Sequence, residues 1–316
     1  MYQYDDPTVS TTLPTPAPAG TGGYFTDGDP VTNEAATLLR ADFMNMVMME
    51  LLNILAAANI TPSKTTYNQV YTAISAMIAK ALISGQCRLT LPGSDLLLSP
   101  FRGNRLPIAG VLQTVPAAGI SLSSSGLTAS TLYYIYAEMV GGVMTLLAST
   151  TGHSTDAATG VEVMTGDATK TLVGMGYVNA AGAWSLVLSW FNRQDVWLNS
   201  STTLSGTVTT SSPVQISLLD VPFLCWGGHA VELCPLLGHQ TSTAGYGVSV
   251  MSYIDGTDVG QAQATSVSFV GQTATTQTTN YTYPTEGYHV AQVWANTNSG
   301  QSITVITGAQ LVKAEG

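Results

Sequence analysis

The sequence predicts a mainly β protein with an N-terminal helical hairpin, and three observations support this fold class. From residue 86 onward, short segments rich in β-branched and aromatic residues are separated by turns containing Gly, Asn and Asp. Residues 32–84 instead place apolar side chains at helical spacing, with one interruption at Pro62. The first 31 residues contain "PTPAPAG" and no long apolar run, which favours extended backbone. We therefore expect an extended arm, a helical neck, an antiparallel β-domain and a C-terminal jelly-roll-like β-sandwich.

The extended arm is predicted to span residues 1–31. Its five prolines and many Thr and Gly residues provide too little apolar surface for this segment to fold alone. The sequence leaves two interpretations open: a disordered tail, or an arm that becomes ordered by lying along a partner.

The first helix of the neck is predicted at residues 32–59, with Thr32 as its N-cap. It contains "ADFMNMVMMELLNILAAANI", which is apolar around nearly its whole circumference. The apolar surface of such a helix is larger than a two-helix hairpin can cover. Asp42 and Glu50 argue against insertion in a membrane, because one Asp at the centre of a bilayer costs about 3 kcal/mol. We expect the surplus apolar surface to contact other copies of the chain.

The second helix completes the neck, which spans residues 32–85. We predict it at residues 66–84, because Thr66 and Gln69 have capping-box spacing and Gly85 stands where a C-terminal glycine belongs. Its apolar residues recur at steps of three and four and form one stripe. The predicted interface between copies comprises Phe43, Met46, Val47, Leu51, Ile54, Tyr67, Tyr71, Ile74 and Ile78.

Three further segments follow the neck. Residues 86–107 contain three prolines and three arginines, and we interpret them as a connector. Residues 108–194 include "TLYYIYAEM" and "WSLVLSWFN" and predict a compact antiparallel β-domain. Residues 195–316 begin with a Ser/Thr/Gly-rich stretch, a linker or polar strands, and continue with regularly spaced strands. This pattern predicts a β-sandwich.

The charge is low and unevenly distributed. Charged residues make up only 9% of the chain, the formal net charge is −10, and no Lys or Arg lies between Arg193 and Lys313. Nucleic acids and anionic membranes are bound largely through basic side chains, so we expect neither as a partner. The acidic N-terminus "MYQYDDPTVS" does not resemble a secretion signal.

The sequence offers no motif for catalysis, for a metal ion or for a cofactor, and we expect a protein that is not an enzyme. The four histidines lie in separate contexts, and the three cysteines form no metal-binding pattern. Glycan hydrolysis needs two carboxylates across a cleft. The last segment could supply such a pair, but Asp255 and Asp258 flank Gly256 and are better explained as turn residues. The carboxylates of this segment are Asp220, Glu232, Asp255, Asp258 and Glu286.

Aromatic residues are the strongest candidates for a binding surface in the last segment. Exposed Trp and Tyr rings often anchor interfaces, and flat rings also stack on sugars. The alternative is that alternating rings, as in "YHVAQVW", fill the sandwich core, and both interpretations stay open for Tyr281 and Tyr283. The candidate receptor-binding residues are Trp226, Tyr246, Tyr253, Tyr281 and Tyr283.

Two parts of the sequence resemble tail-fibre proteins of tailed bacteriophages. Residues 25–74 are similar to their N-terminal region, which carries a Gly- and Pro-containing lead, a helix ending in an "ELLNxLxAAGI"-type run, and a "PSxxxxxQLxxAI" helix. The matching positions here are Glu50–Ile60, Pro62, Ser63, Gln69, Val70, Ala73 and Ile74, with Asn59 in place of the usual Gly. The segment from Gly119 to Asn179 is also similar to a β-domain that recurs in phage tail and fibre proteins.

This resemblance implies a homotrimeric fibre in the virion, assembled in the host cytoplasm. The arm would attach to baseplate or tail proteins, the neck would form the trimer interface, and the distal sandwich would bind a host-surface glycan or pilus protein without covalent chemistry. A baseplate connector or fibre-network protein that never contacts the host is one alternative. A glycan depolymerase is another.

Overall fold

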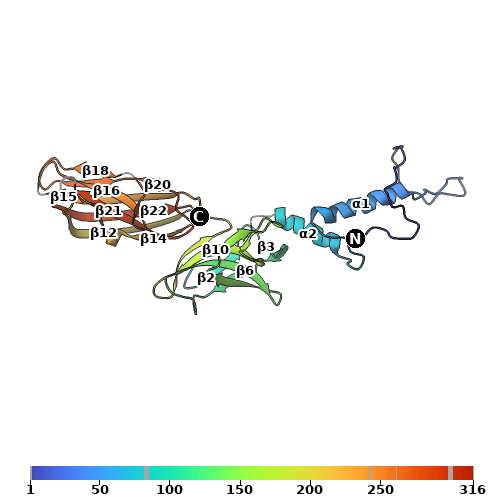
Figure 1. Cartoon of the computed structure of the whole chain (residues 1–316), viewed down its shortest axis with the longest axis horizontal. Coiled ribbons are helices and arrows are strands. Elements are labelled where there is room, and N and C mark those ends of the chain that lie inside the picture. Colours follow the sequence, from blue (N-terminus) through green and yellow to red (C-terminus); the bar gives the residue numbers. More distant parts are fainter. Residues whose placement is uncertain (1, 82–84, 242, 261, 298–301, 316) are drawn as a thin grey trace. The chain divides into compact units, whose positions relative to one another are not determined.

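The computed structural model describes two compact units, formed by residues 2–81, 85–241, 243–260, 262–297 and 302–315. One unit contains the arm and the helices within Met1–Ile83, together with two short segments, and the other contains the bulk of the β-structure. The fold class is the predicted one, because within the described residues both α-helices lie in the first unit and antiparallel sheets make up most of the second (Figure 1). Neither helix is long and apolar enough to cross a membrane, as far as the described residues go.

Helix α1 spans Ala41–Ala57 and begins nine residues later than predicted. Thr32 is not its N-cap, because residues 26–37 form a closed loop held by backbone hydrogen bonds between Asp29 and Glu34. Turn chemistry explains the difference: Asn33 adopts a φ of 55°, and the Asp29 carboxylate accepts a hydrogen bond of 2.8 Å from the Val31 amide.

The end of α1 is a Schellman motif built on asparagine. Asn59 has a φ of 56°, its amide donates to the Ala56 carbonyl at 3.0 Å, and the Ile60 amide donates to the Leu55 carbonyl at 2.9 Å. Asn tolerates the left-handed conformation, so its replacement of the usual Gly preserves the turn into the second helix. Leu55 of α1 and Ala73 of the second helix are fully buried in the hairpin.

Helix α2 spans Gln69–Ala81, and the predicted end at 82–84 lies outside the described residues. Gln69 spans the interhelix loop: its side-chain oxygen accepts from the Ser63 amide at 2.9 Å, and its side-chain nitrogen donates to the Thr61 carbonyl at 2.7 Å. The Thr66 hydroxyl donates to Ser63 Oγ at 3.1 Å. The helix therefore starts at Gln69, three residues after the predicted position.

The β-domain consists of a three-stranded sheet packed on a larger one. The order is β1–β2–β5 in the first sheet and β7–β6–β10–β9–β8 in the second, with β11 pairing β10, and β3 and β4 form a separate two-stranded sheet. The strands are β1 Cys87–Thr90, β2 Leu96–Pro100, β3 Arg105–Ile108, β4 Val111–Thr114, β5 Ile120–Leu122, β6 Thr131–Val140, β7 Val143–Ser149, β8 His153–Thr155, β9 Glu162–Met164, β10 Asp167–Val178 and β11 Trp184–Ser189.

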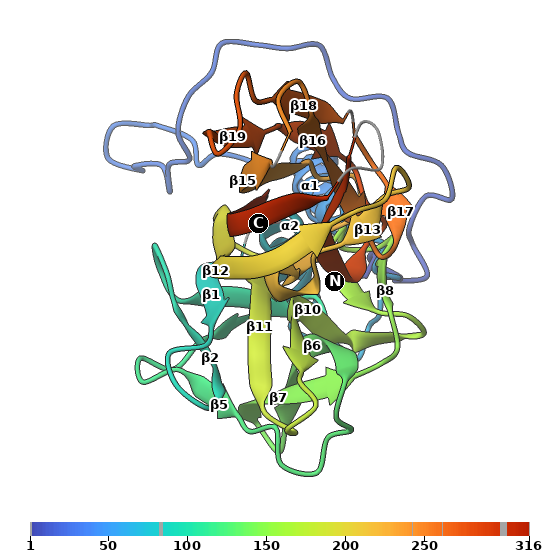
Figure 2. The ribbon, with the colours of Figure 1, turned by 90° about the vertical axis from the view of Figure 1, so that its left-hand side faces the viewer.

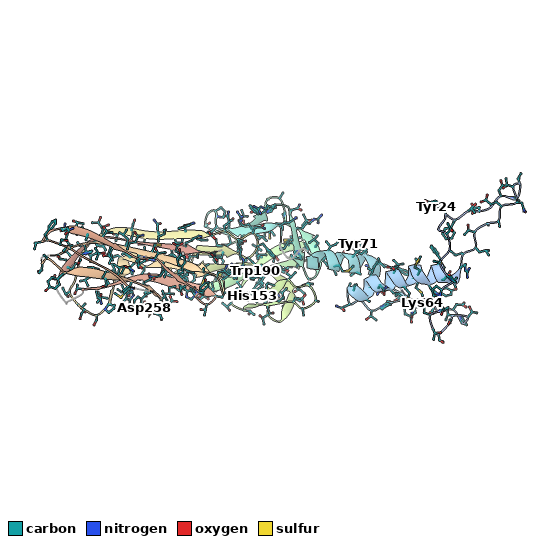
Figure 3. All side chains as sticks on the ribbon, turned by 90° about the horizontal axis from the view of Figure 1, so that it is seen from above. Tyr24, Lys64, Tyr71, His153, Trp190 and Asp258 are labelled. Atoms are coloured by element: carbon teal, nitrogen blue, oxygen red, sulfur yellow. The ribbon has the colours of Figure 1, made fainter. Side chains whose placement is uncertain are left out.

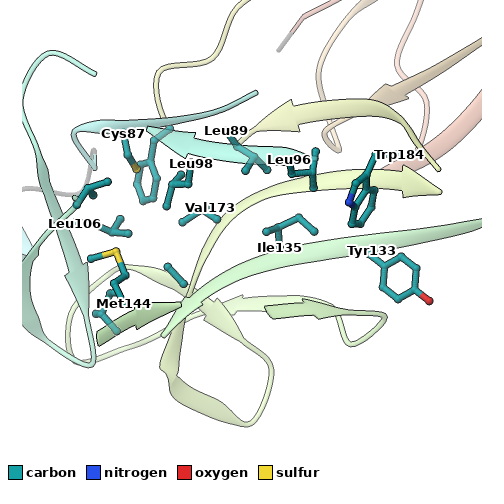
Figure 4. Close-up of a cluster of buried hydrophobic side chains, with 14 of the residues drawn as sticks. Cys87, Leu89, Leu96, Leu98, Leu106, Tyr133, Ile135, Met144, Val173 and Trp184 are labelled. Carbon is teal, nitrogen blue, oxygen red and sulfur yellow. The ribbon is translucent and has the colours of Figure 1, made fainter. Parts of the chain in front are cut away.

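Residues 86–107 are part of this domain, so their interpretation as a connector was wrong. Leu89, Leu98 and Leu106 from this segment are buried in one core with Ile135 of β6 and Val173 of β10 (Figure 4). Two of the three prolines mislead because they occupy strand positions that the sheets tolerate, and Pro92 lies in the turn between β1 and β2. Pro100 is the last residue of β2, and the carbonyl of Pro107 in β3 accepts a hydrogen bond of 2.6 Å from Thr171.

The C-terminal part is a jelly roll of two antiparallel sheets (Figure 2). Sheet one has the order β12–β22–β15–β19, with β20 also pairing β15, and sheet two the order β13–β21–β16–β17, with β14 and β18 pairing β21 and β16. The strand orders β12–β22–β15–β19 and β14–β21–β16–β18 in the two facing sheets are those of a jelly roll. The strands are β12 Val196–Val208, β13 Val214–Gln215, β14 Val221–Cys225, β15 Val231–Thr241, β16 Gly247–Ile254, β17 Thr257–Asp258, β18 Gln263–Ser266, β19 Thr273–Gln277, β20 Asn280–Thr282, β21 Gly287–Thr297 and β22 Ile303–Ala314, with a 3-10 turn at Ser217–Leu219.

Candidate functional site

Trp226, a predicted receptor-binding residue, is buried where the β-domain packs on the jelly roll, and the prediction for it is corrected. Its side chain is only 1% exposed. Its ring lies edge-on to Trp190 at a centroid distance of 4.9 Å, and the Arg193 guanidinium lies 5.3 Å from its centroid. Trp226 contributes to a core that the β-domain and the jelly roll share, so its ring is not at the surface for a host receptor to contact.

His153 lies in the same junction, between two carboxylates. Its Nδ1 is 2.6 Å from Glu162 Oε2, and its Nε2 is 3.1 Å from Glu286 Oε1. The Tyr134 hydroxyl donates to the same Glu286 oxygen at 2.7 Å. Figure 3 shows His153 beside Trp190, and the two rings are 5.4 Å apart. Both ring nitrogens face acceptors, so the arrangement fits a protonated imidazolium that donates twice.

The electrostatics of this cluster favour the ion pairs. The hydrogen bond to Glu286, supported by Glu162, raises the pKa of His153, although burial opposes that rise. Burial would raise the pKa of Glu286, but the hydrogen bonds from His153 and Tyr134 outweigh it and lower that pKa. The His153 ring thus contacts the carboxylates of both Glu162 and Glu286 at a packed junction. We interpret this arrangement as a structural contact.

We predict that the junction loses stability as the pH rises through the raised pKa of His153. A raised histidine pKa stabilises the fold fully below the unfolded value of about 6.5, and this contribution disappears as the pH passes the folded value. Thermal melting between pH 6 and 9 should show the wild type losing its advantage over His153→Gln as the pH rises. Parallel melting curves for the two proteins would refute this assignment.

Tyr246 and Tyr253 are only partly exposed. Tyr253 of β16 stacks on Trp294 of β21, with centroids 4.5 Å apart and ring planes 17° apart. The rings of Tyr253 and Trp294 therefore cover the outside of the second sheet. Because they stack on each other, less of each ring face is available to a ligand.

Tyr281 and Tyr283 lie on the surface, with 64% and 70% of each residue exposed. Tyr281 belongs to β20, at the edge of sheet one, and Tyr283 follows that strand. The structure also exposes Trp197 of β12 to 58%, a residue that the sequence analysis did not select. Its strand reads "VWLNSSTTLSGTV" and was ambiguous between a linker and polar strands, so the one signal was an isolated Trp among Ser and Thr.

The predicted interface residues of the helices leave a large apolar surface uncovered in the single chain. Seven of the nine are exposed, including Phe43, Tyr71 (Figure 3) and Ile74 at 39%, 74% and 43%, whereas Leu51 and Ile54 are half-buried. The other exposed members are Met46, Val47, Tyr67 and Ile78.

The arm lies against the helical hairpin within the first unit. Lys64 Nζ contacts both carboxylate oxygens of Asp5 at 2.8 and 2.7 Å, and the ring of Phe25 lies 5.3 Å from that of Phe43. An open pocket of about 1000 Å³ is lined by residues 2–5 of the arm and by residues of both helices, among them Met44 and Val70, so the arm covers the apolar surface incompletely.

No cluster of His, Cys, Asp and Glu in the described part of the chain has the geometry of a metal site. The three cysteines are free, and Cys87 and Cys225 are buried. Burial raises the pKa of the Cys87 thiol to about 12 and that of Cys225 to about 11, which makes both poor nucleophiles near neutral pH.

No protein-family model matches the sequence, and no curated protein matches it significantly. Among solved structures, the VP2 subviral particle of infectious bursal disease virus aligns with a TM-score of 0.29 and 16% identity. That alignment covers 42% of this chain and 36% of the VP2 chain, about a third of its length. The structure of the Gx strain of that virus aligns with a TM-score of 0.29 and 12% identity, over 74% of this chain and 70% of that one.

A carbohydrate-binding domain, CBM36-1 of a multidomain xylanase from the hindgut metagenome of Trinervitermes trinervoides, aligns with a TM-score of 0.24 and 11% identity. This alignment covers 37% of this chain and 96% of that domain. Alignments this loose assign neither a family nor a function, so the surfaces are interpreted from their own geometry.

Proposed function

We propose that this chain is a tail-fibre protein of a virion, which attaches to the baseplate or tail through its N-terminal arm and binds a host-surface receptor through its jelly roll. Binding is non-covalent, and the chain is not an enzyme in this proposal. The observation that carries this proposal is that the two units expose different kinds of apolar surface. The first presents an uncovered apolar surface suited to assembly, and the second presents exposed aromatic rings on a β-sandwich.

The helical surface supports self-association as a homotrimer. On α2, Tyr71, Ile74 and Ile78 follow each other at steps of three and four and form one exposed stripe, and the exposed Tyr67 lies just before the helix. Contiguous exposed apolar stripes of this kind mark interaction sites in soluble proteins. Packing against copies of the same stripe would remove it from water, and the resemblance to tail fibres favours three copies.

The experiment that tests the proposed function measures adsorption of the purified full-length chain to a panel of bacterial cells over a range of salt concentrations. We expect adsorption to at least one strain and a solution mass of three chains by light scattering. Adsorption that persists at high salt would fit the paucity of basic residues in the jelly roll. Failure to adsorb to any strain at any salt concentration would contradict receptor binding.

The same experiment separates the two alternatives. A baseplate connector would ignore cells and remain bound to baseplate proteins in a pull-down. A depolymerase would release reducing ends from capsule or lipopolysaccharide, which a binding protein leaves intact.

A further inference from the structure

Four side chains form a lateral row across sheet one of the jelly roll. Trp197 of β12 is opposite Lys313 of β22, Lys313 is opposite Glu232 of β15, and Glu232 is opposite Tyr281 of β20. Neighbouring strands lie about 4.8 Å apart, so the backbone positions of the two aromatic residues at the ends of the row are separated by about 14 Å. We call Trp197, Lys313, Glu232 and Tyr281 the aromatic row.

The row lies on the outer face of the sheet. Side chains alternate between the faces of a strand, and the neighbours of the row residues point into the sandwich. Val231, Leu233 and Val312 are fully buried there. Elsewhere on the outer face of β12, the positions are Asn199, Ser201 and Thr203, so a large exposed ring is exceptional on this strand.

Charged groups fill the space between the two rings. Lys313 Nζ lies 5.5 Å from the centroid of Trp197 and 2.8 Å from Asp195 Oδ2. The hydrogen bond to Asp195, with further attraction to Glu232 and Glu315, raises the pKa of Lys313. The negative charge of Glu232 raises the pKa of Tyr281, so its hydroxyl remains a donor. These groups are held in place before any ligand arrives.

We infer that the aromatic row is a binding site for a neutral oligosaccharide. The flat face of each exposed ring suits the C–H face of a pyranose, and burying it removes apolar area from water. Between the rings, a carboxylate accepts hydrogen bonds and an ammonium donates them, which together match adjacent sugar hydroxyls. The distance between the two strand positions accommodates a short run of sugar units. This inference rests on the proposed function, because it names the receptor class and the residues that would bind it.

The charge balance argues against an anionic glycan at the same place. One cation, Lys313, faces three carboxylates, those of Asp195, Glu232 and Glu315. A phosphate, sulfate or uronic acid would approach a site whose nearest charges are net negative and would be repelled. Neutral sugars carry no such penalty.

The test uses the full-length chain and an array of neutral and anionic microbial oligosaccharides, followed by titration of each glycan that binds. We expect binding to one or more neutral glycans, weakened about tenfold or more by Trp197→Ala and by Tyr281→Ala. The matched control is Phe269→Ala. Phe269 is 63% exposed on the loop beside Thr241, at the opposite end of β15 from Glu232, and its removal should leave affinity unchanged.

Tryptophan fluorescence provides a second measurement that does not depend on the array. Of the five tryptophans, Trp184 and Trp226 are 5% and 1% exposed, whereas Trp197 is 58% exposed. A bound glycan should protect the wild type from quenching by acrylamide and should not change quenching of Trp197→Ala. Unchanged melting temperatures would show that the variants remain folded, because both rings lie on the surface.

The outcomes separate this inference from the proposed function. If no neutral glycan binds, or if both alanine variants bind as tightly as the wild type, the aromatic row is not the site. If the wild type and both variants nevertheless adsorb equally to cells, the adhesive function stands and its receptor site lies elsewhere. If the wild type adsorbs to no cells, the proposed function fails.

Discussion

Ile74→Glu is expected to separate the proposed trimer into single chains of 33.0 kDa. Ile74 lies in the middle of the exposed stripe of α2, between Tyr71 and Ile78. In a trimer, the substitution would place three carboxylates in an apolar interface, where each unpaired charge costs several kcal/mol. The single chain already exposes 43% of Ile74, so the substitution should leave the hairpin folded.

The measurement is light scattering at micromolar protein, with circular dichroism to confirm helix content. The matched control is Thr72→Glu, which adds the same charge to the same helix. Thr72 is exposed and lies about 200° around the helix from Ile74 at 100° per residue, on the opposite side. We expect the control to keep the mass of three chains. A trimer that survives Ile74→Glu, or a wild-type chain that is already monomeric, would contradict assembly through this stripe.

Sequence patterns predicted the elements whose signals are local. Strand β21 was predicted at "YHVAQVWA", and in the structure buried and half-buried residues alternate along its whole length, from Gly287 to Thr297. The helical hairpin was predicted from apolar spacing, and Asn59 ends α1 as its tolerance of positive φ suggested. The beginning of α1 was predicted wrongly because loop closure between Asp29 and Glu34 depends on hydrogen bonds that a helical pattern does not reveal.

The candidate site was harder to predict because it depends on contacts between distant segments. Trp226 is buried by Trp190 and His153, which lie 36 and 73 positions earlier in the chain, so its own sequence context gave no sign of burial. Trp197 and Tyr281 become neighbours in one row only through the register of four strands. A sequence without known strand pairing cannot provide that register.

Trp226→Ala is expected to destabilise the second unit more than any other single substitution considered above. The ring is 1% exposed and packs in a cluster with Tyr136, Leu172 and Leu224, which joins the β-domain to the jelly roll. Truncating a buried aromatic residue to alanine lowers the free energy of unfolding by about 3–5 kcal/mol. For a unit of this size, that loss lowers the melting temperature by roughly 6–20 °C. We also expect the single melting transition to separate into two, because the β-domain and the jelly roll would lose their shared core.

Two controls make this prediction specific. Trp226→Phe keeps most of the ring and removes the indole N–H, which is buried and has no hydrogen-bond partner among the described residues, so its effect should be much smaller than that of alanine. Trp197→Ala removes an equally large ring from the surface and should change the free energy of unfolding by less than about 0.5 kcal/mol. Calorimetry at one fixed protein concentration measures all three variants, since self-association makes melting concentration-dependent. Equal melting temperatures for Trp226→Ala and the wild type would show that the junction contributes little to stability, and that the β-domain and the jelly roll fold independently of it.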